Sequence, residues 1–398
     1  MDLETGAGAG RRAADEMAVG VLARTFPPDL VDRVIDQCGR REKRARKLPA
    51  RFMFYFVLAL CLFPQESYRS TMKILTGAFG RSAVGGGVPT AAAIGYARRR
   101  LGADAVEAVV REVIRPTADK ETQGAWYRGW RLVAFDGSVF TVPDTEENDR
   151  EFGRPGSGRG EGRGAFPQVQ TACLVELGTH AVFDARIDRY STSETVLIED
   201  MFGSLQPGML LLADRGIYGF HKWIRAAETG ADLLWRVPSN LILRPVEHLD
   251  DGSYIAEVIP PKKSGATSFR LRVIEYRLPQ AKNGKDELYR LVTTIMDPIK
   301  APAKELAILY HERWDVEGFF KQIKGIQLND ERILRSKSPD GVRQEFWAHL
   351  AAHYATVCIM VDAARAAGLD PDRISHKETV RIIRSRIWRP ESFPPPSP

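Results

Sequence analysis

The stretch GMLLLADRG, residues 208–216, is a continuous apolar run that ends at Asp214. A run of this kind is typical of a central strand that is buried on both faces of a sheet. Upstream, RLVAFDGSVFTVP (residues 131–143) carries four consecutive apolar residues and then turns at Asp136-Gly137, which predicts a second strand. We therefore expect two buried strands that each end in an aspartate.

Strand and helix patterns alternate around these two runs. Two strand-like segments and a helical one lie between the runs, namely VQTACLVEL, HAVFDARI and STSETVLIEDMF. The helical segment FHKWIRAAETG and the buried strand ADLLWRV follow the second run. Mixed strand–helix order of this kind implies an α/β layer architecture with flanking helices.

The texture of the sequence changes along the chain, and the changes predict its domains. Short alternating strands suggest a β-rich insertion within the α/β domain, and helical periodicity dominates both the N-terminal part and the end of the chain. The expected parts are a flexible N-terminus at 1–15, a helical N-terminal DNA-binding domain at 16–125, a catalytic domain at 126–238 and 299–366, a β-rich insertion at 239–298, and a C-terminal helix with a Pro-rich tail at 367–398.

The longest apolar run, FMFYFVLALCLF at 52–63, lies in the helical N-terminal part. As a helix it would reach only about 18 Å, which is too short to cross a bilayer. We interpret it as a buried core helix. A later helix is expected to begin after a Thr90 cap and to stop at Gly102.

Composition favours a globular protein with a polyanionic partner. The 398 residues are 44% hydrophobic, the formal net charge is +6 and the isoelectric point is about 9.1. The four cysteines form no C-x-x-C pair, which argues against a structural zinc and fits a reducing cytosol. We expect a soluble cytoplasmic protein with no membrane association.

The two aspartates at strand ends suggest a metal site. Ligand sites collect at the carboxyl ends of neighbouring strands in α/β sheets, and two carboxylates brought together there need a cation between them. Hard oxygen ligands suit Mg²⁺ or Mn²⁺. An Asp at a strand end is also typical of a turn or a helix cap, so Asp136 and Asp214 alone leave both interpretations open.

A third group lies in AKELAILYHERWDVEGFFKQIKG, residues 303–325, which predicts one long helix. Its Tyr310, Arg313, Glu317 and Lys324 are spaced to share one helix face. A solvated face with i,i+4 ion pairs is the alternative. Gly318 after Glu317 is unfavourable in a helix by about 1 kcal/mol relative to Ala, which suggests a close approach by another group.

These motifs together resemble the insertion-element-4 family of DDE transposases. The spacing Tyr310-x2-Arg313-x3-Glu317-x6-Lys324 matches the family's Y-x2-R-x3-E-x6-K signature. FDGSVFTVPDTEEN and LLADRGIYG resemble its two aspartate motifs, and the intervals from Asp136 to Asp214 and from Asp214 to Glu317 suit the family's core. The resemblance implies a ribonuclease H-like mixed sheet with a β-rich insertion before the glutamate.

The resemblance also implies the chemistry. Asp136, Asp214 and Glu317 would be the catalytic residues and hold two Mg²⁺ or Mn²⁺ ions per active site, which activate the attacking oxygen and stabilise the leaving one. Cleavage and strand transfer at the inverted-repeat ends of an insertion sequence would pass through a DNA hairpin. The partners would be terminal inverted repeats and target DNA, bound by a homodimer in a bacterial, nucleoid-associated setting. The residues expected to bind DNA phosphates are Tyr310, Arg313, Lys324 and Arg215.

Weaker patterns suggest further DNA contacts. The basic cluster at 40–51 could follow a DNA backbone through Arg40, Arg41, Lys43, Arg44, Arg46 and Lys47. Arg98–Arg100 and the loop 154–163 could do the same, and a solvated surface is the alternative for all of them. A flipped base could stack on an aromatic side chain, for which the candidates are Trp235, Tyr289 and Trp314, although core packing is favoured for Trp235 and Trp314.

Two other functions compete with the transposase. One is a ribonuclease H-fold DNA nuclease that cuts without strand transfer, and the other is a domesticated, non-catalytic DNA-binding protein. Plain hydrolysis needs only the carboxylates, so the additional Tyr, Arg and Lys favour the transposase. The three intact acidic residues argue against a non-catalytic protein.

Overall fold

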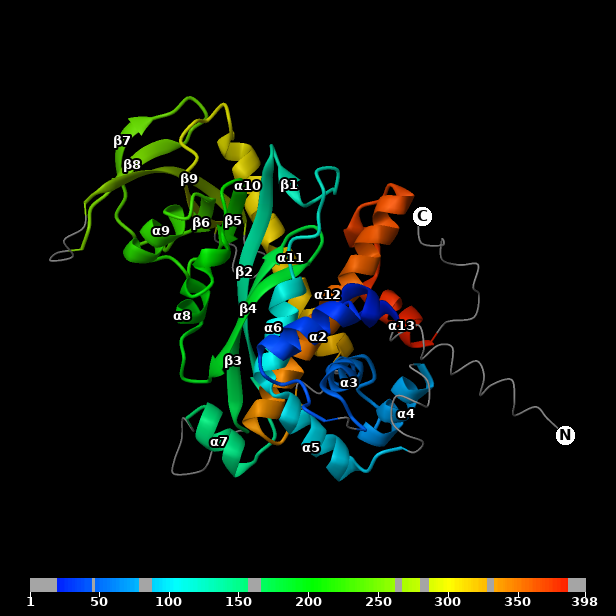
Figure 1. The fold of residues 1–398 in the computed structure, drawn as a ribbon. Helices are drawn as coiled ribbons and strands as arrows, with labels where there is room; N and C mark the ends of the chain where they lie inside the picture. The colour runs from blue at the N-terminus through cyan, green and yellow to red at the C-terminus, as the bar shows by residue number, and fades with distance from the viewer. Residues whose placement is uncertain are drawn as a thin grey trace.

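A computed structural model describes residues 20–44, 47–78, 88–156, 166–261, 267–279, 286–327 and 333–385. Within those ranges, the side chains at 77–78, 278–279, 286–287, 314–317, 325–327 and 385 are outside the description. In the described part, one large mixed sheet crosses the molecule and helices cover both of its faces (Figure 1).

The sheet contains ten described strands in the order β4-β3-β2-β5-β6-β10-β9-β8-β7, with β1 paired to β2. The strands β2, β3 and β4 are antiparallel neighbours, whereas β2, β5 and β6 run parallel. This is the ribonuclease H-like arrangement that the sequence predicts. The bounds are β1 Trp126–Tyr127, β2 Trp130–Thr141, β3 Gln168–Glu176, β4 Val182–Arg189, β5 Met209–Ala213, β6 Asp232–Arg236, β7 Arg244–His248, β8 Tyr254–Val258, β9 Phe269–Pro279 and β10 Asp286–Thr293.

The insertion does not form a sheet of its own. Strand β10 pairs antiparallel with β6, with Leu291 opposite Arg236, and β9, β8 and β7 continue outward from it. The insertion at 239–298 therefore extends the catalytic sheet instead of adding a separate layer. The alternating pattern predicted the strands, but β6 and β10 stand at opposite ends of the insertion in the chain, so their pairing could not be read locally.

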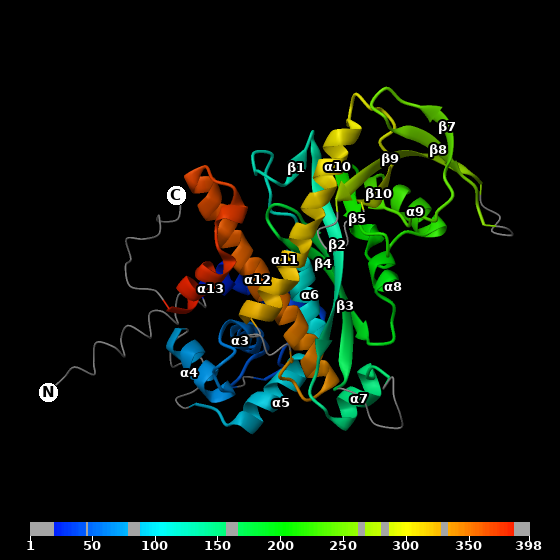
Figure 2. The same cartoon turned by 180° about the vertical axis from the view of Figure 1, so that it is seen from behind.

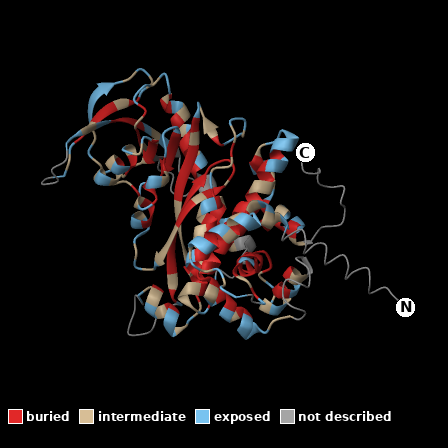
Figure 3. Cartoon of the chain, in the orientation of Figure 1, coloured by how far each residue is buried: buried red, intermediate tan, exposed pale blue. Residues whose placement is uncertain are grey.

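Strand alternation gives the sheet two apolar faces. Val133, Phe135, Leu211 and Ala213 face one core, which is covered by α8 (Glu194–Glu199) and α9 (Phe220–Ala227). Leu132, Ala134, Leu210 and Leu212 face the other core, which is covered by helices from the two ends of the chain. Figure 3 shows buried residues running through the central strands and the helices packed on them.

The N-terminal helices share this second core. Helices α3 and α6 pack on the long helix α12, and the same apolar cluster continues from Leu22 to Ile383. The predicted N-terminal domain at 16–125 is thus packed on the catalytic part instead of forming an independent core. The bounds are α2 Pro28–Gln37, α3 Ala50–Leu62, α4 Tyr68–Ala78, α5 Ala91–Leu101, α6 Ala103–Val113, α7 Glu146–Phe152, α12 Pro339–Ala367 and α13 His376–Ser385, with short 3-10 turns at Phe202–Ser204 (η2) and Pro371–Arg373 (η5).

The local signals for two of these helices are confirmed. The Thr90 hydroxyl accepts a hydrogen bond from the Ala93 amide at 3.2 Å, and α5 stops at Gly102, whose φ is 76°. Helix α3 is buried at all of its positions except Arg51 and packs on α12, as expected for a core helix. Among the described helices, none is both long and apolar enough to span a bilayer.

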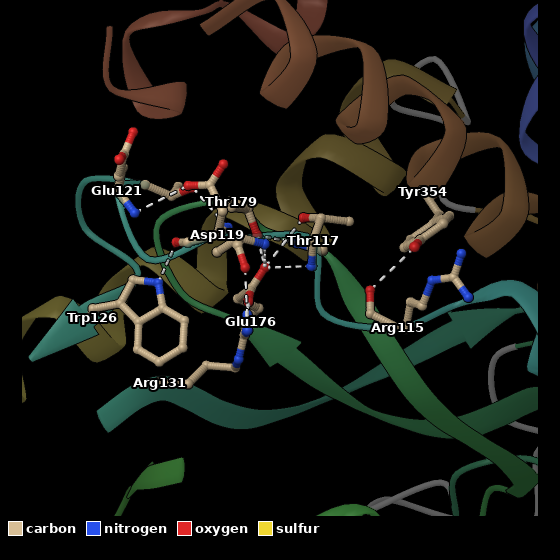
Figure 4. A network of polar contacts seen from close by, with 12 residues as sticks. Arg115, Thr117, Asp119, Glu121, Trp126, Arg131, Glu176, Thr179 and Tyr354 are labelled. Carbon is tan, nitrogen blue, oxygen red and sulfur yellow. Dashed lines mark hydrogen bonds and ion pairs between the residues drawn. The ribbon is translucent and has the colours of Figure 1, made fainter. Parts of the chain in front are cut away.

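A buried carboxylate joins the segment after α6 to the sheet (Figure 4). Glu176 at the end of β3 forms an ion pair with Arg131 and accepts hydrogen bonds from the backbone amides of Thr117 and Ala118, each at 2.8 Å. The Thr179 hydroxyl also donates to it at 2.7 Å. The Arg131 guanidinium and these hydrogen-bond donors together compensate the negative charge of the buried Glu176 carboxylate.

The predicted single helix at 303–325 is interrupted. It consists of α10 (Ala303–His311), a 3-10 turn η3 (Glu312–Trp314), α11 (Asp315–Lys321) and a π-helical segment η4 (Gln322–Gln327). Figure 2 shows α10 and α11 lying across the sheet beside β2. Changes of helical pitch are common at functional sites, and periodicity alone does not reveal them.

Candidate active site

Asp136 and Asp214 occupy equivalent positions on neighbouring parallel strands. In the β2–β5 pairing, Arg131 lies opposite Met209 and Ala134 lies opposite Leu212. Continuing this register by two positions sets Asp136 opposite Asp214. Asp214 follows the last residue of β5, as predicted. Asp136, by contrast, lies within β2, which continues to Thr141 in its pairing with β3, and it marks only the end of the parallel pairing.

Both aspartates belong to the sheet face that α10 and α11 cover. Leu132 and Ala134 share this face with Leu210 and Leu212, and alternation continues it to residues 136 and 214. The Tyr310 hydroxyl on α10 donates to Asp214 Oδ1 at 3.4 Å. Two strands and the covering helix thus bring the carboxylates together beneath the signature segment.

Tyr310 is buried instead of facing solvent. Only 1% of it is exposed, and its hydroxyl also lies 3.4 Å from the Ala213 carbonyl. Arg313 is 8% exposed, with its guanidinium 5.8 Å from the centre of the Tyr310 ring. Burial raises the pKa of the Tyr310 phenol, while the positive charge of Arg313 opposes that shift. The sequence predicted a direct phosphate contact for Tyr310, but in the structure its hydroxyl contacts Asp214.

Lys324 contacts β2 from the π-helical segment. Its ammonium donates to the Ser138 hydroxyl and lies 5.0 Å from the centre of the Phe140 ring. Ser138 is two residues from Asp136 and therefore shares its sheet face. Lys324 therefore contacts β2 two residues beyond Asp136, toward the C-terminal end of the strand.

Glu317 lies midway in sequence between Tyr310 and Lys324, the residues that make these two contacts. Its backbone belongs to α11, which packs on β2. The side chains of Glu317 and Trp314 are outside the described residues. The close approach expected at the next residue, Gly318, is not found: a Cβ there would lie 3.4 Å from His180 Cε1, an ordinary contact distance that leaves room for alanine.

A carboxylate that sequence reasoning missed lies on the other side of β2. Glu194 opens α8, and its Oε1 would be 2.6 Å from a Cβ built on Gly137. Its pKa is raised, first by desolvation and then by the negative charge of Asp214. Spacing could not identify Glu194, because it belongs to no motif. The Gly that follows Asp136 was the available signal, since it leaves space for another side chain.

The oxygen donors at this edge of the sheet fit a hard divalent cation. Asp136, Asp214 and Glu194 supply carboxylates, and Gly137 provides a cradle that a Cβ would fill. In the described part of the chain, which leaves out the Glu317 side chain, no three His, Cys, Asp or Glu side chains lie close enough together to hold an ion.

The remaining side chains predicted to contact DNA near the site differ in how far they are exposed to solvent. Arg215 is exposed beside Asp214. Trp235 is fully buried against Trp223 in the core under α9, which is the core packing that the sequence favoured over base stacking for this residue. Tyr289 is half-buried, stacked on Tyr276 at 5.4 Å between ring centres.

The basic cluster is largely solvent-facing. Arg40 pairs with Asp104 at 3.0 Å, and Arg46 lies outside the described residues. The exposed members are Arg41, Lys43, Arg44 and Lys47.

Most of the described arginines of α5, and Arg154 in the loop after α7, have partners within the protein. Arg98 is buried and donates to Gln344 at 3.2 Å, so it cannot contact DNA as it stands. Arg100 donates to Glu42, whereas Arg99 is exposed and lies over the Tyr96 ring. Arg154 pairs with Asp144 and Asp149, and the rest of the predicted loop contact, 157–163, lies outside the described residues.

The fold and the paired acids define a ribonuclease H-like enzyme that works on phosphodiesters. Comparison with known proteins is more specific. Residues 128–355 match the family profile described as the transposase DDE domain, and residues 16–111 match the insertion element 4 transposase N-terminal profile. The chain belongs to the insertion element 4 family of DDE transposases, enzymes that cut and transfer DNA strands and depend on divalent metal ions.

Individual relatives agree with the profiles. The chain is 26% identical over 369 residues to the transposase InsG for insertion sequence element IS4 of Escherichia coli K12, covering 91% of this chain and 81% of that protein. It is 24% identical over 220 residues to the putative transposase InsZ of the same organism, covering 55% and 71%. A solved structure of the piggyBac transposase in a synaptic complex with hairpin DNA covers 92% of this chain and 79% of its own, at 8% identity and a TM-score of 0.48.

Proposed function

We propose that this transposase cuts and joins the inverted-repeat ends of an insertion element, with Asp136, Asp214 and Glu317 as the catalytic carboxylates. The observation that carries the proposal is the β2–β5 register, which sets the two aspartates side by side beneath the signature segment. Contacts on both sides of Glu317, Tyr310 to Asp214 and Lys324 to Ser138, support its approach to the same point.

The proposed site holds two divalent cations, Mg²⁺ or Mn²⁺. When bound, they supply activation of the attacking oxygen and charge neutralisation at the leaving one. A water oxygen first attacks phosphorus in line, and the bond to the 3′ oxygen breaks. The freed 3′-hydroxyl is the next nucleophile, and attack on the opposite strand closes a hairpin. No covalent bond to the protein is required.

The basic side chains have separate roles in this proposal. Tyr310 is a positioning residue for Asp214, because its buried hydroxyl meets that carboxylate. Lys324 holds the π-helical segment to β2 and lies where a terminal phosphate would pass. Arg313, on the Tyr310 ring, and the exposed Arg215 offer planar donors to phosphate oxygens.

Two further surfaces fit DNA. The exposed basic residues at 41–47 suit a phosphate backbone. For the hairpin, Tyr289 is the described aromatic candidate for stacking a flipped base, since Arg236 lies 4.0 Å from its ring centre and adds a cation. Joining two ends needs two active sites, so we propose a DNA-bound homodimer that also captures target DNA.

The test uses labelled DNA carrying the element's end, the full-length chain, and Mg²⁺ or EDTA. Glu317→Gln is compared with Glu312→Gln, a control at an exposed position on the same segment. We expect metal-dependent cleavage at the terminus followed by a hairpin product, lost with Glu317→Gln and retained with Glu312→Gln.

The products separate the alternatives. Nicks that never become hairpins or joined ends would indicate a nuclease without strand transfer. Metal-independent binding, with the wild type and Glu317→Gln equally inert on all ends tried, would contradict the catalytic proposal and leave a DNA-binding protein.

A further inference from the structure

Glu194 approaches the candidate site from the side of the sheet opposite α11. It is the first residue of α8, whose Leu197 and Ile198 pack in the core on that side. The side chain reaches back to β2 instead of pointing along its own helix, because its carboxyl carbon and Oε1 lie against Gly137. The signature motif contains no residue from this helix.

Gly137 makes this approach possible. A Cβ at this position would overlap the Glu194 carboxyl group, with Oε1 only 2.6 Å away. The amide of the same glycine donates to Asp136 Oδ1 at 3.0 Å. Asp136 and Glu194 therefore contact one residue from two sides, and Asp214 lies at the matching position on the next strand.

The surroundings of Glu194 differ from those of the other glutamate on α8. Glu199 forms ion pairs with Arg225 at 2.6 Å and Lys222 at 3.5 Å. Among the described residues, no Lys, Arg or His forms an ion pair with Glu194. Glu194 is solvent-exposed, so its carboxylate at Gly137 is accessible to an ion, and a carboxylate near a like charge without a protein cation is suited to a bound metal.

We propose that Glu194 is a fourth carboxylate of the cation site, and that Gly137 is required because its missing side chain is the space that Glu194 occupies. The inference rests on the proposed function of Asp136 and Asp214. It adds a ligand from a helix outside the three acidic motifs, so the cation is held from both sides of β2.

The first test measures Mn²⁺ binding to the full-length chain by electron paramagnetic resonance, without DNA. Glu194→Gln is compared with Glu199→Gln, its matched control on the same helix. We expect Glu194→Gln to weaken Mn²⁺ binding by about 10-fold or more, since changes around metal ligands cost roughly that much. Glu199→Gln is expected to bind Mn²⁺ like the wild type.

Melting temperatures separate a ligand from a structural residue. In EDTA, Glu194→Gln should melt at or above the wild-type temperature, because a repelled charge is gone. In Mn²⁺ its upward shift should be smaller than that of the wild type. An equal loss of melting temperature in both buffers would show a structural role and overturn the proposal.

The glycine gives an independent variant. Gly137→Ala should displace Glu194 and reproduce its weak Mn²⁺ binding, whereas Gly203→Ala, where a Cβ meets nothing within 4 Å, should not. Asp136→Asn tests the metal site itself, separately from the role of Glu194. If Asp136→Asn weakens Mn²⁺ binding and Glu194→Gln does not, only the role of Glu194 is wrong. If neither variant changes Mn²⁺ binding, the proposed metal site fails as well.

Discussion

Two acidic regions of the same sheet have opposite electrostatic surroundings. At the end of β3, Glu176 is fully buried and surrounded by Arg131, two backbone amides and two hydroxyls. Farther along β2, Asp136 lies near Asp214 and Glu194, and the described residues provide no ion pair to either of the latter two. A compensated carboxylate stabilises the fold, whereas carboxylates such as Asp214 and Glu194, to which no described residue forms an ion pair, are available to a cation.

The largest effect is expected at the compensated carboxylate. Glu176→Ala removes the carboxylate that pairs with Arg131 and leaves two buried amides without an acceptor, so the free energy of unfolding should fall by about 3–5 kcal/mol. Denaturant unfolding measures it. The control is Glu146→Gln, in an exposed i,i+4 pair with Arg150, which should change stability by about 0.5 kcal/mol or less. A similarly small change for Glu176→Ala would show that the buried Glu176 carboxylate does not stabilise the fold.

The buried His376 is expected to make the stability of the protein depend on pH. His376 is 4% exposed and stacks on His353 with ring centres 4.8 Å apart. Burial, with the charges of His180 and Arg384, lowers the pKa of His376 to about 4 from 6.5. In that window the unfolded chain binds more protons, so stability should be lost as pH falls from about 6.5 to about 4, by up to about 3 kcal/mol.

Unfolding curves across this pH range measure the effect. His376→Leu should flatten the acid side of the stability profile, although His353, whose pKa is also lowered, keeps part of the slope. The exposed His248→Asn is the control and should leave the profile as it is. An unchanged slope in His376→Leu would show that His376 does not couple protonation to folding.

Asp214→Asn should give the opposite stability result to Glu176→Ala. The change removes a negative charge that raises the pKa of Glu194, so unfolding in EDTA should be unchanged or up to about 1 kcal/mol more costly. Cleavage of labelled DNA should be lost. A drop in stability as large as that of Glu176→Ala would mean that Asp214 is a structural carboxylate.

The smallest effect is expected for Tyr310→Phe. The hydroxyl meets Asp214 and the Ala213 carbonyl at 3.4 Å, distances typical of weak hydrogen bonds. Losing about 0.5–1.5 kcal/mol should slow cleavage roughly 2- to 10-fold with little change in KM for DNA. A large rise in KM would instead support the direct phosphate contact that the sequence suggested.

Features that depend on local sequence patterns were predicted correctly. The apolar runs at 132–135 and 209–213 lie in the central strands β2 and β5, and the α/β order with its ribonuclease H-like fold is confirmed. The helix stop at Gly102 and the buried α3 are also correct, because caps and apolar periodicity act within a few residues. The family follows from three ordered motifs, which need no knowledge of contacts.

The sequence by itself therefore determined which segments form the two central strands, to which family the chain belongs, and how far apart along the chain the two aspartates lie. Only the tertiary structure decided that the β2–β5 register sets the two aspartates opposite each other, that the insertion extends the sheet, and that the signature segment leaves the α-helical pitch twice. Likewise Tyr310 is turned to Asp214, and Glu194 reaches Gly137 from another helix. Contacts between distant segments depend on packing and register across the whole sheet, which no local pattern encodes.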